Sequence, residues 1–69
     1  MRVYKHLTPI DTKILDLAAR EGLTTREIAV KLGRSDASIR SLWTGILWKL
    51  GARRMAHAVY LAVKDGVLK

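Results

Sequence analysis

The 69-residue sequence contains no cysteine and only one proline, and its acidic residues are few. Without cysteine, neither a disulfide framework nor a thiolate zinc site can stabilise the fold, and a reducing compartment suits the chain best. A domain of this size buries only about 60% of the surface that its unfolded chain exposes. Stability must therefore come from a compact core or from a partner subunit.

Long apolar runs are also missing. The longest stretches free of charge, 41–48 and 55–63, are much shorter than the roughly 20 apolar residues that span a bilayer. The first nine residues, MRVYKHLTP, contain no apolar region of the signal-peptide kind. We expect a soluble, cytoplasmic protein that has no membrane partner.

The sequence offers no group of residues typical of catalysis. His6 and His57 lie far apart in the chain, and no cluster of carboxylates accompanies either of them. A glycine-rich phosphate loop is absent, and Ser35, Ser38 and Ser41 have no base nearby in the sequence. We therefore expect no enzyme activity, no metal site and no cofactor, with these serines acting as a helix cap and as surface residues.

Basic charge is abundant and concentrated in the middle of the chain. Thirteen Lys and Arg against six Asp and Glu give a net charge of +7. Between Arg26 and Arg54 the only acidic residues are Glu27 and Asp36. Such an excess favours a polyanionic partner, although composition alone does not separate nucleic acid from acidic lipid or acidic protein.

Helix start and stop signals divide the chain into four helices. Polar capping residues precede the first three helices and glycines follow them. The caps are Thr8, Thr24 and Ser35, and the glycines are Gly22, Gly33 and Gly51. We expect a single all-α domain over 1–69, with an N-terminal arm at 1–6 and with helices at about 9–21, 25–32, 36–50 and 55–65.

The second and third expected helices have the spacing of a helix-turn-helix. Ala29 falls where the two helices cross and only a small side chain fits, and Gly33 falls at the turn, where a positive φ costs glycine least. Ile39 and Leu42 then supply apolar contacts from the third helix. The alternative is an ordinary helical hairpin with small residues at its crossing, and the basic charge favours the helix-turn-helix.

Several further landmarks occur together at matching spacing. They are LTP at 7–9, EGLTTREIAVKL at 21–32, SIR at 38–40, IL at 46–47, KLGA at 49–52 and AV at 58–59. With these landmarks, 7–68 resembles the LuxR/GerE/FixJ-type DNA-binding domain. The resemblance implies a bacterial or phage transcription regulator that associates with the nucleoid. It is either a stand-alone domain of the GerE kind or a fragment of a larger regulator with a sensor domain. Region 4 of bacterial sigma factors shares the first three helices and the turn, and is the second choice.

Some residues depart from that family. Gly33 stands where a larger apolar residue is usual, Leu42 replaces a commonly polar residue, and Trp48 replaces a basic one. The fourth helix begins with Arg54-Met55-Ala56 in place of Asn-Arg-Thr. These departures put the affinity for DNA and the geometry of the target in question. For Trp48 we expect packing beneath the fourth helix, with a protein interface or the DNA backbone as alternatives.

Helical periodicity divides the third helix into two faces. If Ile39, Trp43, Ile46 and Leu50 face inward, the outward residues are Ala37, Arg40, Ser41, Thr44 and Trp48. The resemblance implies contacts with base edges at Arg40, Ser41 and Thr44, and a bidentate pair between arginine and guanine is worth roughly 1 to 3 kcal/mol of discrimination. Contacts with phosphates are expected at Thr25, Arg26, Ser38 and Lys49. The alternative for each is a solvated surface or capping residue.

The fourth helix is more apolar than one buried face requires, since eight of the nine residues in MAHAVYLAV are apolar. The resemblance implies a homodimer interface near Val59, Tyr60 and Val63, so that two copies read an inverted repeat in double-stranded DNA. Alternatively, the helix merely closes the core. Two rival functions stay open: an adaptor that binds RNA polymerase or another regulator through the fourth helix and Trp48, and nonspecific coating of nucleic acid by charge.

Overall fold

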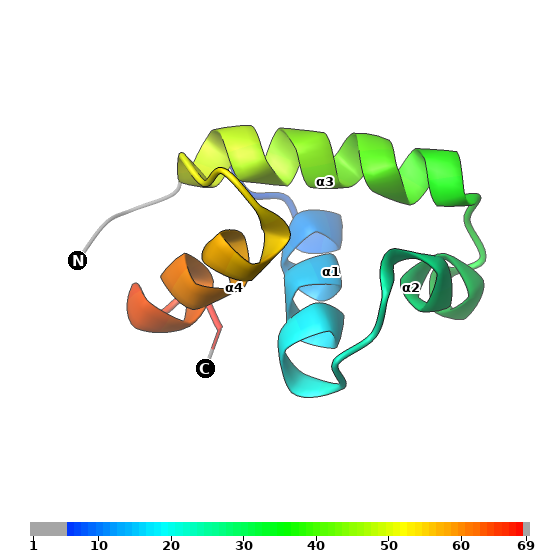
Figure 1. Cartoon of the computed structure of the whole chain (residues 1–69), viewed down its shortest axis with the longest axis horizontal. Coiled ribbons are helices and arrows are strands. Elements are labelled where there is room, and N and C mark those ends of the chain that lie inside the picture. The colour runs from blue at the N-terminus through cyan, green and yellow to red at the C-terminus, as the bar shows by residue number, and fades with distance from the viewer. Residues whose placement is uncertain (1–5, 69) are drawn as a thin grey trace.

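The computed structural model describes residues 6–68 and has four helices, with no strand in that range. The helices are α1 (Pro9–Arg20), α2 (Thr25–Leu32), α3 (Asp36–Leu50) and α4 (Met55–Lys64) (Figure 1). The predicted all-α fold with four helices is confirmed. Helices α1 and α4 each end one residue earlier than expected, because Glu21 and Asp65 are their C-caps. Of the expected N-terminal arm, 1–5 lie outside the described residues.

The starts of the first two helices are fixed by reciprocal capping boxes. The Thr8 hydroxyl accepts a hydrogen bond from the Asp11 amide at 3.3 Å, and the Asp11 carboxylate accepts one from the Thr8 amide at 3.1 Å. Thr24 and Glu27 repeat this arrangement at 3.2 and 2.9 Å. The hydrogen bonds from Thr24 lower the pKa of Glu27. These local bonds explain why the sequence predicts both helix starts correctly.

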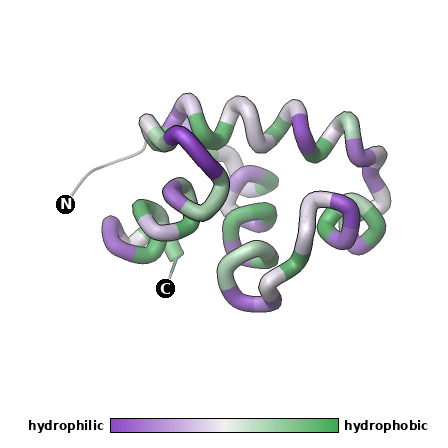
Figure 2. The backbone as a smooth tube through the Cα atoms, in the orientation of Figure 1, coloured by the Kyte–Doolittle hydropathy of each residue, from purple (hydrophilic) through white to green (hydrophobic). Residues whose placement is uncertain are grey.

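Helix α1 lies beneath α3, with α2 and α4 on opposite sides of it (Figure 1). Figure 2 shows apolar residues recurring along each helix at intervals of about one turn. Their side chains meet in a single core, whose buried members are Ile14, Leu15, Leu17, Ile28, Ala29, Ile39, Trp43, Ile46, Leu50, Ala58, Leu61 and Ala62. Every helix contributes to this core, so the four helices position one another.

One buried ion pair joins the end of α3 to the start of α1. The Lys49 ammonium lies 2.6 Å from the Asp11 carboxylate, and Asp11 is only 2% exposed. Burial raises the pKa of Asp11, but the hydrogen bonds from Lys49 and Thr8 outweigh burial and keep that pKa below its ordinary value. The pair therefore holds the last turn of α3 against α1 in its charged form.

Candidate nucleic-acid interface

A short turn that contains Gly33 joins α2 to α3. Gly33 adopts the left-handed conformation, with φ 66° and ψ 36°, and the Arg34 amide donates to the Ala29 carbonyl at 2.9 Å. Ser35 then caps α3 by accepting from the Ser38 amide at 3.1 Å. Ala29 is buried, and α2 and α3 pack against each other. One face of α3 therefore packs into the core, and the opposite face stays exposed.

The three residues predicted to contact bases lie together on the exposed surface of α3 and form what we call the outward row: Arg40, Ser41 and Thr44. Within residues 6–68, no carboxylate pairs with Arg40. The Thr44 hydroxyl donates to the Arg40 carbonyl at 3.1 Å, so its oxygen keeps lone pairs free to accept. The row thus combines a free guanidinium with two small hydroxyl side chains.

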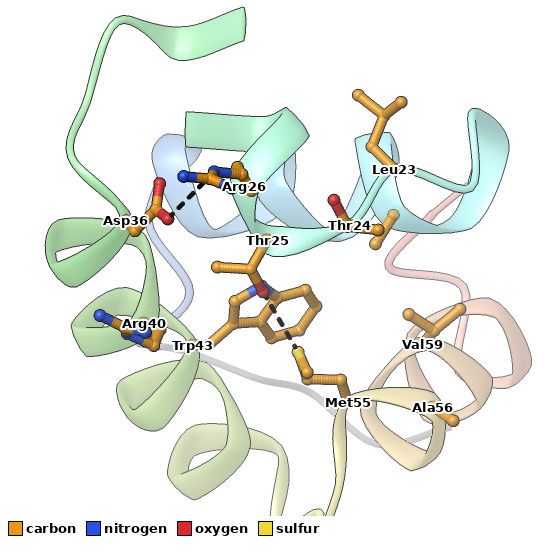
Figure 3. Close-up of a pocket in the computed structure, with 11 residues that line it drawn as sticks. Leu23, Thr24, Thr25, Arg26, Asp36, Arg40, Trp43, Met55, Ala56 and Val59 are labelled. Carbon is orange, nitrogen blue, oxygen red and sulfur yellow. Dashed lines mark hydrogen bonds and ion pairs between the residues drawn. The ribbon is translucent and has the colours of Figure 1, made fainter. Parts of the chain in front are cut away.

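A groove lies between α3, the start of α2 and the start of α4, and we call it the side groove. It has a volume of about 600 Å³. Its lining includes Thr25, Arg26, Arg40, Trp43, Met55 and Val59 (Figure 3). The Thr25 hydroxyl donates to the Met55 sulfur at 3.8 Å, which links the start of α2 to the start of α4. Two residues predicted to bind phosphate, Thr25 and Arg26, therefore lie beside Arg40 of the outward row.

Three of the residues predicted to bind phosphate, Lys49, Ser38 and Arg26, make contacts within the chain. The ammonium of Lys49 is held by Asp11 at 2.6 Å and 26% of its side chain is exposed, so the phosphate contact expected for it stays a prediction. Ser38 is half-buried, and its amide is used by the Ser35 cap. Arg26 lies 3.8 Å from Asp36, but 85% of its side chain is exposed. Of these three residues, Arg26 presents the most accessible charge.

Trp43 forms the floor of the side groove. It is 4% exposed, and its indole Nε1 is the single buried side-chain polar atom in residues 6–68 that lacks a hydrogen-bond partner. Figure 3 shows the indole beneath Thr25, with Met55 approaching from α4. The floor of the side groove thus contains an unpaired N–H donor, the Trp43 Nε1, which the sequence does not reveal.

Trp48 does not pack beneath α4, so the prediction for it is wrong. The buried residues of α3 are Ile39, Trp43, Ile46 and Leu50, and position 48 falls on the opposite side of the helix. Trp48 is 84% exposed. A large apolar side chain thus lies one turn after Thr44 on the surface that carries the outward row.

Helix α4 keeps an exposed apolar face. Met55 is 48% exposed, Tyr60 58% and Val63 56%, whereas Val59 is partly buried against the core and lines the side groove. Lys64 lies over the Tyr60 ring, with its ammonium 5.9 Å from the ring centre. Two of the three residues predicted at a dimer interface, Tyr60 and Val63, are therefore available to a partner, and Val59 is less so.

Comparison of the chain with protein-family models, curated proteins and solved structures finds no match. None of the helices within residues 6–68 has both the length and the apolar character that crossing a bilayer requires. In the same range, no three His, Asp or Glu side chains are grouped so as to hold a metal ion. The exposed surfaces of α2, α3 and α4 are therefore the candidate site.

Proposed function

We propose that the protein is a sequence-specific regulator of transcription that inserts α3 into the major groove of double-stranded DNA. The observation that carries this proposal is the outward row, exposed on a helix that follows a left-handed turn at Gly33. Helix α3 bears a single acidic residue, Asp36, at its start, so the rest of its surface does not repel phosphate. The resemblance to LuxR/GerE/FixJ-type domains supports the same function.

Each residue of the outward row has a suitable chemistry. The Arg40 guanidinium can donate two hydrogen bonds to O6 and N7 of a guanine, and no carboxylate in the described residues competes for it. Ser41 and Thr44 are small enough to let the helix approach base edges. Thr25 and Arg26 contact the phosphates of the strand that runs past the side groove. The net charge of +7 supplies the nonspecific part of the affinity.

The proposal includes a homodimer that forms through the apolar face of α4. Met55, Tyr60 and Val63 are exposed there, and a second copy of the same face would cover them. A two-fold axis at α4 would direct both α3 helices toward one side of the dimer. The target would then be an inverted repeat with half-sites about one helical turn of DNA apart. Under this proposal the protein acts on the bacterial nucleoid or on a phage genome in the cytoplasm.

A second candidate is an adaptor that binds RNA polymerase or another regulator. The observation favouring it is that apolar side chains are exposed on two surfaces, Trp48 on α3 and Tyr60 on α4. An adaptor needs no discrimination between DNA sequences, and a sigma region-4-like domain would need RNA polymerase to select its site. The ability of the isolated chain to select a sequence therefore separates the candidates.

The test is selection of binding sites from a pool of random double-stranded DNA, followed by titration of the selected and random duplexes at several salt concentrations. We expect selected DNA to be preferred by at least about a thousandfold over random DNA. Arg40→Ala should reduce that preference by about tenfold or more. Lys13→Ala removes the same charge from an exposed residue of α1 and should keep the preference. Equal binding of selected and random DNA would refute sequence-specific recognition.

A further inference from the structure

Gly45 lies in the middle of α3, where no internal requirement explains a glycine. A Cβ at this position would meet nothing within 4 Å, and Gly45 is not among the glycines with positive φ. Glycine inside a helix is unfavourable, since its backbone loses more freedom on folding than that of any other residue. Neither packing nor backbone conformation accounts for this cost, which points to a role for Gly45 at the surface of the helix.

The missing side chain borders a hollow beside Trp48. This hollow has a volume of about 630 Å³ and is lined by His6, Thr44, Gly45, Trp48 and Lys49. Trp48 is three residues after Gly45, the spacing of neighbours on a helix surface, and its indole is exposed. A side chain at position 45 would occupy the space that lies next to the indole.

The net charge of +7 favours DNA as the occupant of this hollow. Among residues 6–68, no acidic residue lines the hollow, and Thr44 joins it to the outward row. A second copy of the chain placed here would bring two basic surfaces together, whereas a nucleic acid brings phosphates to them. The indole offers an apolar ring and one N–H donor. In the major groove, thymine is the base that presents an apolar methyl group beside an acceptor, O4.

We propose that Gly45 and Trp48 form a contact site for the 5-methyl group of a thymine, adjoining the outward row. Gly45 allows the base edge to approach the helix, and the indole covers the methyl group from one side. The inference rests on the proposed function, because the hollow meets a base only if α3 enters the major groove. It adds a thymine next to the bases that Arg40, Ser41 and Thr44 contact.

The experiment uses the full chain and the DNA site obtained by selection. Each thymine of that site is replaced in turn by deoxyuridine, which lacks only the 5-methyl group. For the wild type, we expect each half-site to contain one thymine whose replacement by deoxyuridine weakens binding about fourfold. This is the factor for removing one methyl group from an apolar contact. Trp48→Ala should weaken binding to the thymine site and abolish the difference between thymine and deoxyuridine.

Gly45→Ala provides the variant that separates binding from folding. It should raise the unfolding temperature, because alanine is the better helix residue, and yet weaken binding to the selected site severalfold. Val30→Ala is the matched control, since it removes an exposed apolar side chain from α2 and should leave the deoxyuridine profile unchanged.

The possible failures are distinguishable. If the chain selects a site but the deoxyuridine series is flat, or if Trp48→Ala keeps the difference, the thymine contact is refuted and the proposed function stands. If Trp48→Ala instead changes the sedimentation of the free protein, the surface pairs with a second copy, which also refutes the thymine contact. If no sequence is selected, the proposed function and this inference fall together.

Discussion

Replacement of Lys49 by methionine tests whether this lysine stabilises the fold or binds DNA. Methionine keeps most of the length of the side chain but leaves the Asp11 carboxylate, which is 2% exposed, without its ammonium partner. Removing one partner of a fully buried pair costs about 3 to 5 kcal/mol. Because 26% of the Lys49 side chain is exposed, water can reach part of the site, and we expect a loss of about 2 to 3 kcal/mol.

Such a loss is large for this domain. Domains of this length have unfolding free energies of roughly 3 to 10 kcal/mol, so Lys49→Met should remove a substantial fraction of the total. At about 4 to 8 °C per kcal/mol, the unfolding temperature should fall by roughly 10 to 20 °C. Thermal unfolding followed by circular dichroism at pH 7 measures this shift. Adding Asp11→Asn to Lys49→Met should recover most of the stability, because the amide oxygen can still accept from the Thr8 amide.

The result that refutes this reasoning is specific. If Lys49→Met changes the unfolding free energy by less than about 0.5 kcal/mol, the pair behaves like an exposed ion pair and does not hold α3 to α1. If the same variant also lowers the affinity for all DNA sequences equally and reduces the salt slope by about one, Lys49 binds a phosphate, as the sequence first indicated. DNA affinity is measured at a temperature below the unfolding transitions of both the wild type and Lys49→Met, so that it does not depend on the difference in stability.

Three further predictions concern the turn at Gly33, the loss of stability at acidic pH and the exposed face of α4. Gly33→Ala should cost about 1 kcal/mol or more in urea unfolding, because its φ of 66° disfavours a Cβ, whereas an unchanged midpoint would contradict the left-handed turn. The pKa values of Asp11 and Glu27 are lowered in the folded state, so near pH 4 the unfolded chain binds more protons than the folded chain. The unfolding free energy should therefore fall as the pH drops below about 5, and Asp11→Asn should make that fall shallower. Val63→Glu should convert the proposed dimer to a monomer in sedimentation experiments while leaving binding to a single half-site intact; a wild-type protein that is already monomeric at high micromolar concentration would rule out the dimer.

The helices were predictable because their boundaries depend on local chemistry. Thr8, Thr24 and Ser35 cap amides three residues away, so the starts of α1, α2 and α3 follow from a few adjacent residues. The outward row was equally predictable, since four apolar residues of α3 fix which face turns inward. The same periodicity places Trp48 on the outward side, which agrees with its 84% exposure and contradicts the expectation that it packs beneath α4.

Contacts between distant residues were not predictable. Lys49 and Asp11 are separated by 38 positions in the sequence, and no pattern near either residue predicts their ion pair. The role proposed for Gly45 also depends on the structure, because the sequence does not show the open space around this residue. The side groove brings together residues of α2, α3 and α4, and its floor carries the unpaired Trp43 donor.

The side groove also links the two surfaces on which the proposed function depends. Met55 is exposed on the face of α4 that a second copy would cover, and its sulfur accepts the hydrogen bond of Thr25, which lies at the start of α2. Trp43 lies below both residues and belongs to the same helix as the outward row. A change in packing at α4 can therefore reach Thr25, which we propose contacts phosphate, through Met55 and Trp43. Under the proposed function, pairing of two copies and binding of DNA would share these side chains, and linkage would make the effect of each on the other equal in size.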